Sequence, residues 1–280
     1  VSKSGDMAGS VSGGCVESAV VFEAMDALEE GTLKLFEYGV SDGDAFAVGL
    51  ACGGKIRILL EPVGPSFPVE MLEELVHARA TRRSAAYCVN IQTGVRHIAY
   101  LGYEARMRMD RSGFEEDKET FIAVHNSPLR MIVIGAVHIA QTLVPMARLA
   151  GFDPVIIDPR ESFGSAQRFP QEQVVNEWPD EGLAELGGDA RTALVLLTHD
   201  PKLDDPALQY ALSSDYFYIG ALGSKRTHAQ RVERFIKNDY SQDQIDRING
   251  PVGLNIGSAT PAEIAVSILA QMIDCLRRSQ

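Results

Sequence analysis

Two cysteines of this 280-residue chain each stand beside a pair of glycines. Cys15 follows Gly13 and Gly14 in the stretch SVSGGCVES, where the pattern predicts that a strand turns into a helix. The free backbone N–H groups of a first helical turn attract anions, and the positive end of the helix dipole lowers the pKa of a thiol there. These residues could therefore hold a phosphate or an oxo group beside a reactive thiolate.

The second cysteine, Cys52, precedes Gly53 and Gly54 in the stretch VGLACGG. Glycines let the backbone approach a ligand closely, and thiolates are soft ligands that bind transition metals or carry sulfur transiently. The alternative is that Cys15 and Cys52 are small buried hydrophobic residues among turn glycines. The spacing of these residues does not choose between the two interpretations.

A strand–turn–helix–strand pattern begins at Arg130 and organises the second half of the chain. The apolar run 131–134 ends at Gly135, and a second run, 155–157, ends at Asp158. Between them, apolar residues recur at spacings of three and four, as on one face of a helix. The order of these segments predicts the first βαβ unit of a Rossmann-type sheet, which suggests a dinucleotide.

The dinucleotide fingerprint itself is incomplete. Of its three glycines only Gly135 is present, although Ala140 can replace the one needed for packing. Val137 puts a branched side chain where the pyrophosphate should lie, and His138 follows it. Asp158 stands where a ribose-binding acid is expected, but an Asp before a proline is also ordinary turn chemistry. NAD(P) binding is therefore only weakly indicated.

Further candidates follow two other predicted strands, 193–198 and 216–221. The carboxyl ends of parallel strands form the ligand crevice of such a sheet. His199 and Asp200 could transfer protons there, or they could be a solvated histidine and a turn-capping acid. A glycine turn into a basic helix could hold a phosphate, or it could be a solvated helix start. The residues of this second group are Gly223, Ser224, Lys225 and Arg226.

Composition narrows the class of protein. The formal net charge of −12 argues against nucleic acid and anionic membrane surfaces as partners, because no basic face exists to neutralise phosphates. No apolar stretch reaches the length of a membrane-spanning helix, and no signal peptide is visible. The four cysteines are widely separated without zinc-site spacing, which favours a reducing cytoplasm.

The elements predict an α/β fold with two domains. Residues 1–110 are expected to form a smaller N-terminal α+β domain, and residues 128–280 a Rossmann-like domain with a parallel sheet. The polar stretch 110–119 makes residues 111–127 the predicted linker. Antiparallel strands are expected at 85–91, 97–101 and 103–109.

Several long motifs resemble the XdhC/CoxI family, and the resemblance covers nearly the whole chain. It is carried by GDMAGSVSGGCVESAV, YGVSDGDAFAVGLACGGKI, LTHDPKLDDPAL, IGALGSKRTHAQR and IGSATPAEIAVSILA. Members of this family are accessory proteins for molybdenum hydroxylases such as xanthine dehydrogenase. The resemblance implies a homodimer that binds molybdenum cofactor, assists the replacement of an oxo ligand by sulfur with a cysteine desulfurase, and delivers the cofactor to the apo-enzyme.

The implied chemistry fits the candidate residues. A helix start at Gly13 and Gly14 suits a phosphate or an oxo group, and Cys15 or Cys52 would contact molybdenum or carry sulfur. Family members usually carry a further N-terminal Arg-Pro-x-Gly-Ser type motif, so we expect part of the first-domain site to be missing before Val1. The expected function is that of a cofactor-binding chaperone, not a turnover enzyme. The alternatives are an NAD(P)-dependent oxidoreductase acting on a small substrate, and a structural partner of a hydroxylase complex.

Overall fold

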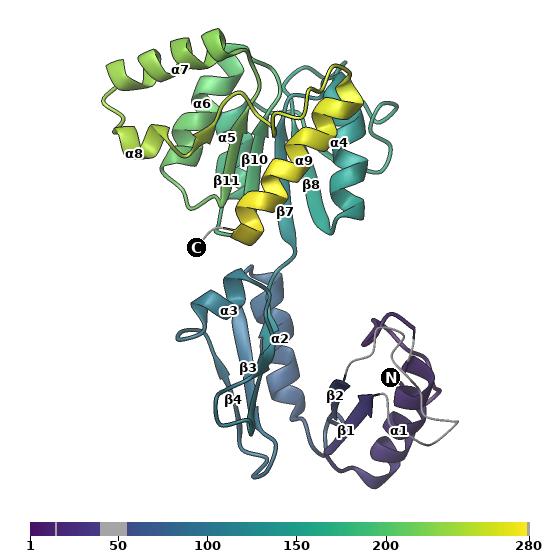
Figure 1. Ribbon diagram of the computed structural model, residues 1–280. Helices are drawn as coiled ribbons and strands as arrows, with labels where there is room; N and C mark the ends of the chain where they lie inside the picture. Colours follow the sequence, from purple (N-terminus) through teal and green to yellow (C-terminus); the bar gives the residue numbers. More distant parts are fainter. Residues whose placement is uncertain (15, 40–54, 279–280) are drawn as a thin grey trace. The chain divides into compact units, whose positions relative to one another are not determined.

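The computed structural model describes residues 1–14, 16–39 and 55–278 (Figure 1). The chain divides into two compact units, Val1–Asn126 and Ser127–Gln280. Each cluster of buried hydrophobic side chains belongs to one of these units. No helix in the described ranges is long and apolar enough to cross a membrane.

The first unit begins with a helix and a two-stranded antiparallel hairpin. Val16 and Val20 pack against Ile58 of the hairpin, so the apolar face of the helix lies on one face of these strands. The helix ends at Gly31, which has a φ of 70° and whose N–H caps the carbonyl of Ala27. The elements are α1 (Glu17–Glu30), β1 (Lys34–Gly39) and β2 (Lys55–Leu60).

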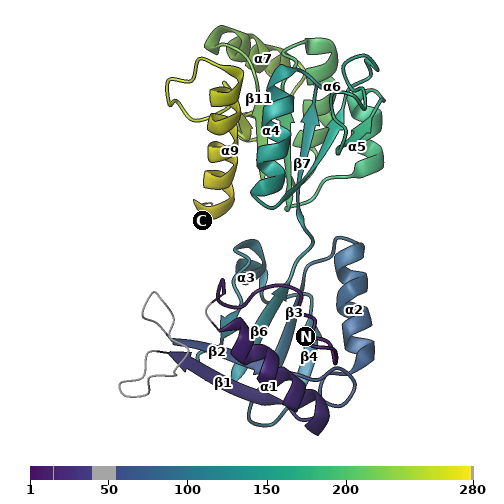
Figure 2. The same ribbon diagram turned by 90° about the vertical axis from the view of Figure 1, so that its right-hand side faces the viewer.

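The remainder of the first unit is an antiparallel sheet with the strand order β4-β3-β6-β5 and a helix against each face (Figure 2). Leu75 of α2 packs with Tyr87 on one face, and Met107 of α3 packs with Ile122 on the other. The elements are α2 (Val69–Ala80), β3 (Ala85–Asn90), β4 (Arg96–Ala99), α3 (Glu104–Arg108), β5 (Gly113–Phe114) and β6 (Thr120–His125).

Two expectations for this unit require correction. Residues 111–127, predicted to be a linker, contain β5 and β6, and β6 pairs with β3 along its whole length. The alternating stretch TFIAVH has the period of a half-buried strand, and only the polar residues before it form a turn. The predicted strand 103–109 is instead the short helix α3.

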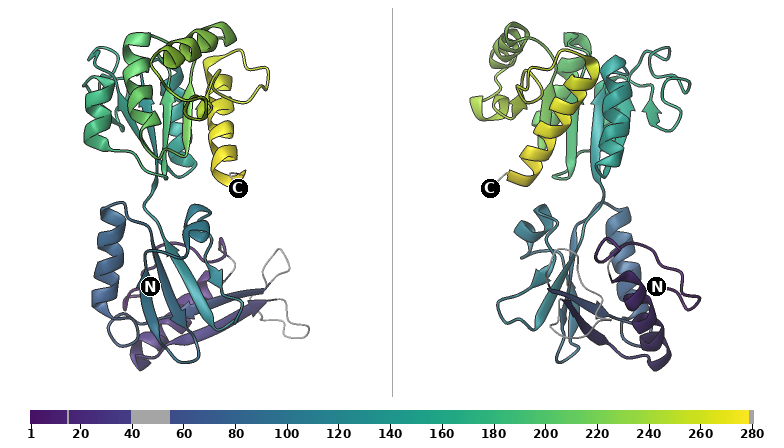
Figure 3. Two further views of the ribbon diagram at one scale, coloured as in Figure 1. Left: turned by 90° about the vertical axis from the view of Figure 1, so that its left-hand side faces the viewer. Right: turned by 45° about the vertical axis from the view of Figure 1, so that its right-hand side comes forward.

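The second unit is a parallel sheet with helices on both faces (Figure 3), which confirms the predicted Rossmann-like fold. The strand order is β12-β11-β10-β7-β8-β9, so the order reverses between β7 and β10, where such sheets bind ligands. The strands are β7 (Leu129–Ile134), β8 (Phe152–Ile157), β9 (Gln173–Val175), β10 (Thr192–Leu196), β11 (Tyr218–Ala221) and β12 (Ile248–Asn249).

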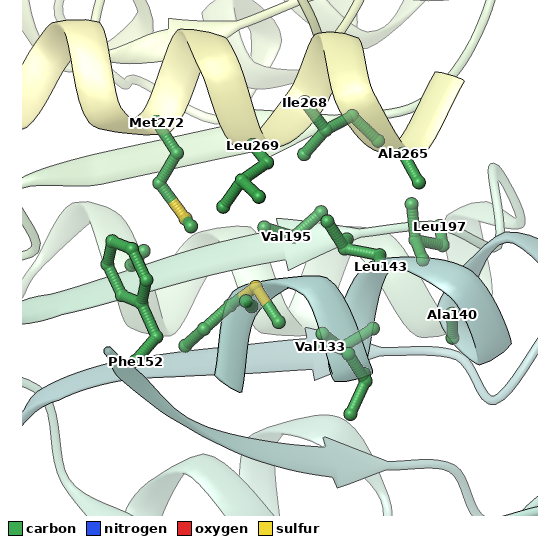
Figure 4. Close-up of a cluster of buried hydrophobic side chains, with 14 of the residues drawn as sticks. Val133, Ala140, Leu143, Phe152, Val195, Leu197, Ala265, Ile268, Leu269 and Met272 are labelled. Atoms are coloured by element: carbon green, nitrogen blue, oxygen red, sulfur yellow. The ribbon is translucent and has the colours of Figure 1, made fainter. Parts of the chain in front are cut away.

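The central strands are apolar throughout because helices bury both of their faces. On one face Val133 and Val195 meet Leu143 of α4 and Ile268 of α9 (Figure 4). On the other face the buried side chains of the strands pack against α5, α6 and α7. The helices are α4 (His138–Leu149), α5 (Pro179–Leu186), α6 (Pro201–Leu212), α7 (Lys225–Lys237), α8 (Gln242–Ile245) and α9 (Pro261–Arg278).

Candidate functional site

The candidates in the second unit all follow the carboxyl ends of β7, β8, β10 and β11. Gly135 ends β7 with a φ of 103°, and a Cβ placed on it would lie 2.5 Å from Cγ2 of Thr198, just after β10. Arg160 follows β8, and the negative charge of Asp200, which follows β10, contributes to raising its pKa. The structure therefore gathers these residues at the edge where the strand order reverses.

Asp158 is fully buried and its carboxylate is saturated with hydrogen bonds. Its Oδ2 accepts from the backbone N–H of Ala136 at 2.8 Å and from Nη2 of Arg160 at 2.7 Å. Its Oδ1 accepts from the backbone N–H and Nε of Arg160, at 3.0 and 2.8 Å. Burial alone would raise the pKa of Asp158, but the hydrogen bonds from Arg160 and Ala136 outweigh it and lower the pKa.

A carboxylate offers about four acceptor positions, and all four of Asp158 are in use. Ribose hydroxyls would have to displace Arg160 to bind there. Asp158 instead fastens the glycine turn after β7 to the end of β8. Of the two meanings that the sequence left open for this acid, the geometry favours the structural one.

An arginine–aromatic cluster borders the same turn. Arg168 donates from Nη1 to the carbonyl of Ala136 and to that of Phe163, each at 2.7 Å. The guanidinium carbon of Arg160 lies 4.0 Å from the centre of the Phe163 ring. Sequence reasoning missed Arg168 and Phe163, because they lie after β8 in a loop without a recognisable motif. Arg160 is ion-paired with Asp158, so the positive charge of Arg168 is what favours an anionic ligand beside the turn.

The N-terminus of α4 is the open end of this arrangement. Its N-cap residue is Val137, which contributes no capping side-chain hydrogen bond, and His138 is exposed at its first position. The first N–H groups of the helix thus have no side-chain cap, and such groups suit an anion. Val137, which argues against a pyrophosphate, leaves this end available to a different anionic group.

His199 and Asp200 follow β10, and one of them has a structural role in the described structure. Asp200 is the N-cap of α6 and accepts from the backbone N–H of Lys202 at 3.0 Å. His199 is exposed with a φ of 48°, and no hydrogen bond joins the two side chains in the described structure. The capping alternative therefore accounts for Asp200.

The glycine turn before α7 is also built as a helix start. The hydroxyl of Ser224 accepts from the backbone N–H of Thr227 at 3.1 Å, and Gly223 has a φ of 143°. Lys225 and Arg226 are exposed. They leave two positive charges at the carboxyl edge of the sheet, although the cap takes one of the N–H groups that a phosphate would need.

A buried ion pair between α6 and α7 was not foreseen. Asp204 of α6 accepts from the hydroxyl of Thr198 at 2.5 Å and from Nη2 of Arg231 at 3.3 Å. Arg231, on α7, also donates to the carbonyl of Leu222 at 3.0 Å. Burial raises the pKa of Asp204 and lowers that of Arg231, while their attraction opposes both shifts. The only signal in the sequence is that Arg231 shares a helix face with the apolar Phe235, and this face is recognised as buried only once the structure is known.

In the first unit, the anion cradle predicted at Gly13 and Gly14 exists, but the chain fills it. The Glu17 carboxylate accepts from the backbone N–H groups of Ser12 and Gly14, at 2.9 and 2.8 Å. It also accepts from the hydroxyls of Ser10 and Ser12, at 2.6 and 2.7 Å. Hydrogen bonds from Ser10 and then Ser12 hold the pKa of Glu17 far below its ordinary value.

The remaining candidates of the first unit, Cys15, Cys52, Gly53 and Gly54, lie outside the described residues. Among the residues that the structure does describe, no group of three His, Cys, Asp or Glu side chains is placed to hold a metal ion.

Comparison with known proteins finds relatives whose names refer to molybdenum cofactor or to xanthine dehydrogenase. The chain is 28% identical over 272 residues to the molybdenum cofactor insertion chaperone PaoD of Escherichia coli, covering 97% of this chain and 75% of that protein. It is 26% identical over 301 residues to a probable xanthine dehydrogenase subunit of Bacillus subtilis, covering 99% of this chain and 86% of that one.

Among solved structures, a crystal structure described as a xanthine dehydrogenase from Bacillus halodurans matches with a TM-score of 0.74. Its sequence identity is 25%, and the match covers 99% of this chain and 85% of that one. The family model for the XdhC Rossmann domain matches residues 131–272, and the model for the XdhC and CoxI family matches residues 1–39. Since the first of these alone covers half of the sequence, the chain belongs to the XdhC/CoxI family.

Proposed function

We propose that this protein is an accessory factor that binds molybdenum cofactor and inserts it into a xanthine dehydrogenase-type molybdenum hydroxylase. The observation that carries the proposal is the similarity to PaoD, a molybdenum cofactor insertion chaperone, over 97% of this chain and 75% of that protein. The relative from Bacillus subtilis, a probable xanthine dehydrogenase subunit, supports the class of client enzyme.

The described residues fit parts of this cofactor, which combines a pterin, a phosphate and a metal held by two sulfur atoms. The uncapped start of α4, with Arg168 near it, suits the phosphate. Lys225 and Arg226 add positive charge at the start of α7. When bound, the metal supplies the oxo- and sulfido-transfer chemistry that the client enzyme uses.

The proposal also covers the roles of the two cysteines, the source of the sulfur and the oligomeric state. Cys15 and Cys52 are the residues assigned to the metal or to transient sulfur. The chain would hold the cofactor while a cysteine desulfurase supplies the sulfur that replaces an oxo ligand. A homodimer working in the cytoplasm completes this picture, in keeping with the family resemblance and the widely separated thiols.

Metal and pterin analysis of the purified protein tests the proposal. After co-expression with the cofactor's biosynthetic pathway, we expect molybdenum and an oxidised pterin in comparable amounts. Cys15→Ser and Cys52→Ser should each lower the molybdenum content, whereas Cys275→Ser, at a half-buried position of α9, should not. A wild-type protein that carries neither metal nor pterin would contradict the proposal.

Nicotinamide cofactor titration separates this function from the oxidoreductase alternative. Asp158 has no acceptor position to spare and Val137 occupies the pyrophosphate position, so we expect no thermal stabilisation by NADH or NADPH. A cofactor present at a hundred times its Kd would stabilise the folded state by about 2.7 kcal/mol, which a melting curve detects readily. Stabilisation of that size would favour the oxidoreductase.

A further inference from the structure

A pocket of about 320 Å³ lies within the first unit, and its lining contains none of the candidate residues that the structure describes. It is bounded by the end of β2, the loop that follows it, and the face of the antiparallel sheet that α2 partly covers. Its volume falls within the range of small-molecule binding sites.

The strand register explains why aromatic side chains gather in this pocket. Phe121 and His125 are separated by an even number of positions along β6, so their side chains share one face of the sheet. Tyr87 of β3 stands opposite Ala123, between these two positions, on the same face. Phe67, from the loop after β2, meets the Tyr87 ring edge-on with 5.0 Å between ring centres. Three aromatic rings thus line the pocket.

The polar feature of the pocket is a carboxylate held in place by the protein. Oε1 of Glu61 accepts from the hydroxyl of Tyr87 at 2.6 Å and from Nη1 of Arg96 at 3.1 Å. The side chains of Glu61 and Arg96 are each only 14% exposed. Arg96 is anchored in turn by the carbonyls of Gly94 and Ser66. The Glu61 carboxylate therefore has a fixed position and cannot swing freely into solvent.

The other oxygen of Glu61 remains available. Within the described residues Oε2 receives no hydrogen bond, so it keeps both of its acceptor positions, and Glu61 is one of the residues that line the pocket. His125 also lines the pocket, and burial, together with the nearby charge of Arg79, lowers its pKa. The site thus offers a negative acceptor, a neutral imidazole and aromatic surfaces.

We propose that this pocket binds the aminopyrimidinone edge of a planar bicyclic heterocycle, with Glu61 accepting hydrogen bonds from its amino and ring N–H groups. Such an edge presents adjacent donors to a carboxylate, and its flat faces pack against aromatic rings. Pterins and guanine share this edge. The choice of a pterin rests on the proposed function, because molybdenum cofactor contains one.

Titration of free pterin, followed by its fluorescence, tests the pocket without metal or client enzyme. Glu61→Gln preserves the acceptor for Tyr87 and Arg96 but places an NH2 group where Oε2 stood, so pterin should bind about tenfold more weakly or worse. Glu74→Gln is the matched control. Glu74 also accepts from a tyrosine hydroxyl, that of Tyr100 at 2.8 Å, but it does not line the pocket. That variant should bind pterin like the wild type.

Phe121→Leu is a second variant, which removes an aromatic wall while leaving Glu61 in place. It should also weaken pterin binding, and thermal melting of each variant shows that the protein is folded. Guanosine, which carries the same aminopyrimidinone edge, is titrated in parallel to show whether the pocket prefers a pterin or guanine. Tighter binding of pterin than of guanosine supports the assignment, and the reverse order overturns it.

The two proposals can fail separately. If the co-expressed wild-type protein carries molybdenum and pterin, but free pterin does not bind or Glu61→Gln binds it unchanged, the pocket assignment is overturned and the function stands. If the wild-type protein carries neither, the function fails. The free-pterin titration then still decides whether this pocket recognises the heterocycle.

Discussion

At the scale of single residues, the sequence around Gly13 and Gly14 predicted a site for an anion but did not show which anion the folded chain places there. The backbone N–H groups of Ser12 and Gly14 do point at an anion, but that anion is the carboxylate of Glu17, and the N–H of Gly13 donates to the hydroxyl of Ser10. The N-terminal turn of α1 therefore already has its negative charge. Any phosphate or oxo group bound there would have to displace Glu17.

Replacing Glu17 with Gln tests the contribution of this carboxylate to folding. Gln lacks the charge and one acceptor oxygen, so the melting temperature should fall by a few degrees. Glu23→Gln, on the same helix, is the control and should leave it unchanged, since the substitution removes the same charge without disturbing the cradle.

The effect of Glu17 should also depend on pH. Its pKa is lowered in the folded protein, so its contribution is complete above its ordinary pKa of 4.5 and is lost as the pH falls below that value. The difference in melting temperature between wild type and Glu17→Gln should therefore shrink on acidification. A difference that stays constant from pH 7 to pH 3 would contradict this account.

At the scale of elements, the buried pair of Asp204 and Arg231 connects four segments of the second unit. It links α6 to α7, the segment after β10 through Thr198, and the end of β11 through the carbonyl of Leu222. The side chains of Asp204 and Arg231 are 1% and 2% exposed. Removing one partner would leave the other as an uncompensated charge in the interior.

Arg231→Met should therefore lower the free energy of unfolding by about 3 kcal/mol, measured by urea denaturation. Arg234→Met is a matched control three residues along α7. Arg234 pairs with Asp205 through two hydrogen bonds, but its side chain is 36% exposed, so its loss should cost less than about 1 kcal/mol. Equal losses in the two variants would show that burial gives the Asp204–Arg231 pair no special role.

The elements that the sequence predicted well are those whose burial leaves a simple pattern. The strands at 129–134 and 192–196 are covered on both faces, and their stretches 131–134 and 193–196 are therefore unbroken apolar runs. The segments at 104–108 and 120–125 were misjudged. Each is short and partly exposed, and the partner that decides its conformation is far away in the sequence.

The same distinction explains which site residues could be predicted. The common location of Gly135, Asp158 and Asp200 could be predicted because the ends of parallel strands lie at one edge by topology alone. Their hydrogen bonds could not be foreseen, since the partners of Asp158 and the cradle contacts of Glu17 depend on loop geometry. Glu61 gave no signal, because its neighbours Tyr87 and Arg96 are 26 and 35 residues away.

At the scale of the whole molecule, the chain carries two separate sets of buried side chains. The larger core lies on both faces of the parallel sheet, and its members all belong to residues 127–280. The described residues of the first unit form three smaller clusters around the hairpin and the antiparallel sheet. A unit with its own core and its own sheet is expected to fold by itself.

We therefore expect a fragment of residues 127–280 to fold independently. The single tryptophan of the chain, Trp178, precedes α5, so intrinsic fluorescence reports on this unit alone, whereas circular dichroism reports on both. In urea, the fluorescence midpoint should be the same for the fragment and for the whole chain, because the core around the sheet is complete in both. A fragment without a cooperative transition, or with a much lower midpoint, would show that the Rossmann-like unit depends on the first 126 residues for its stability.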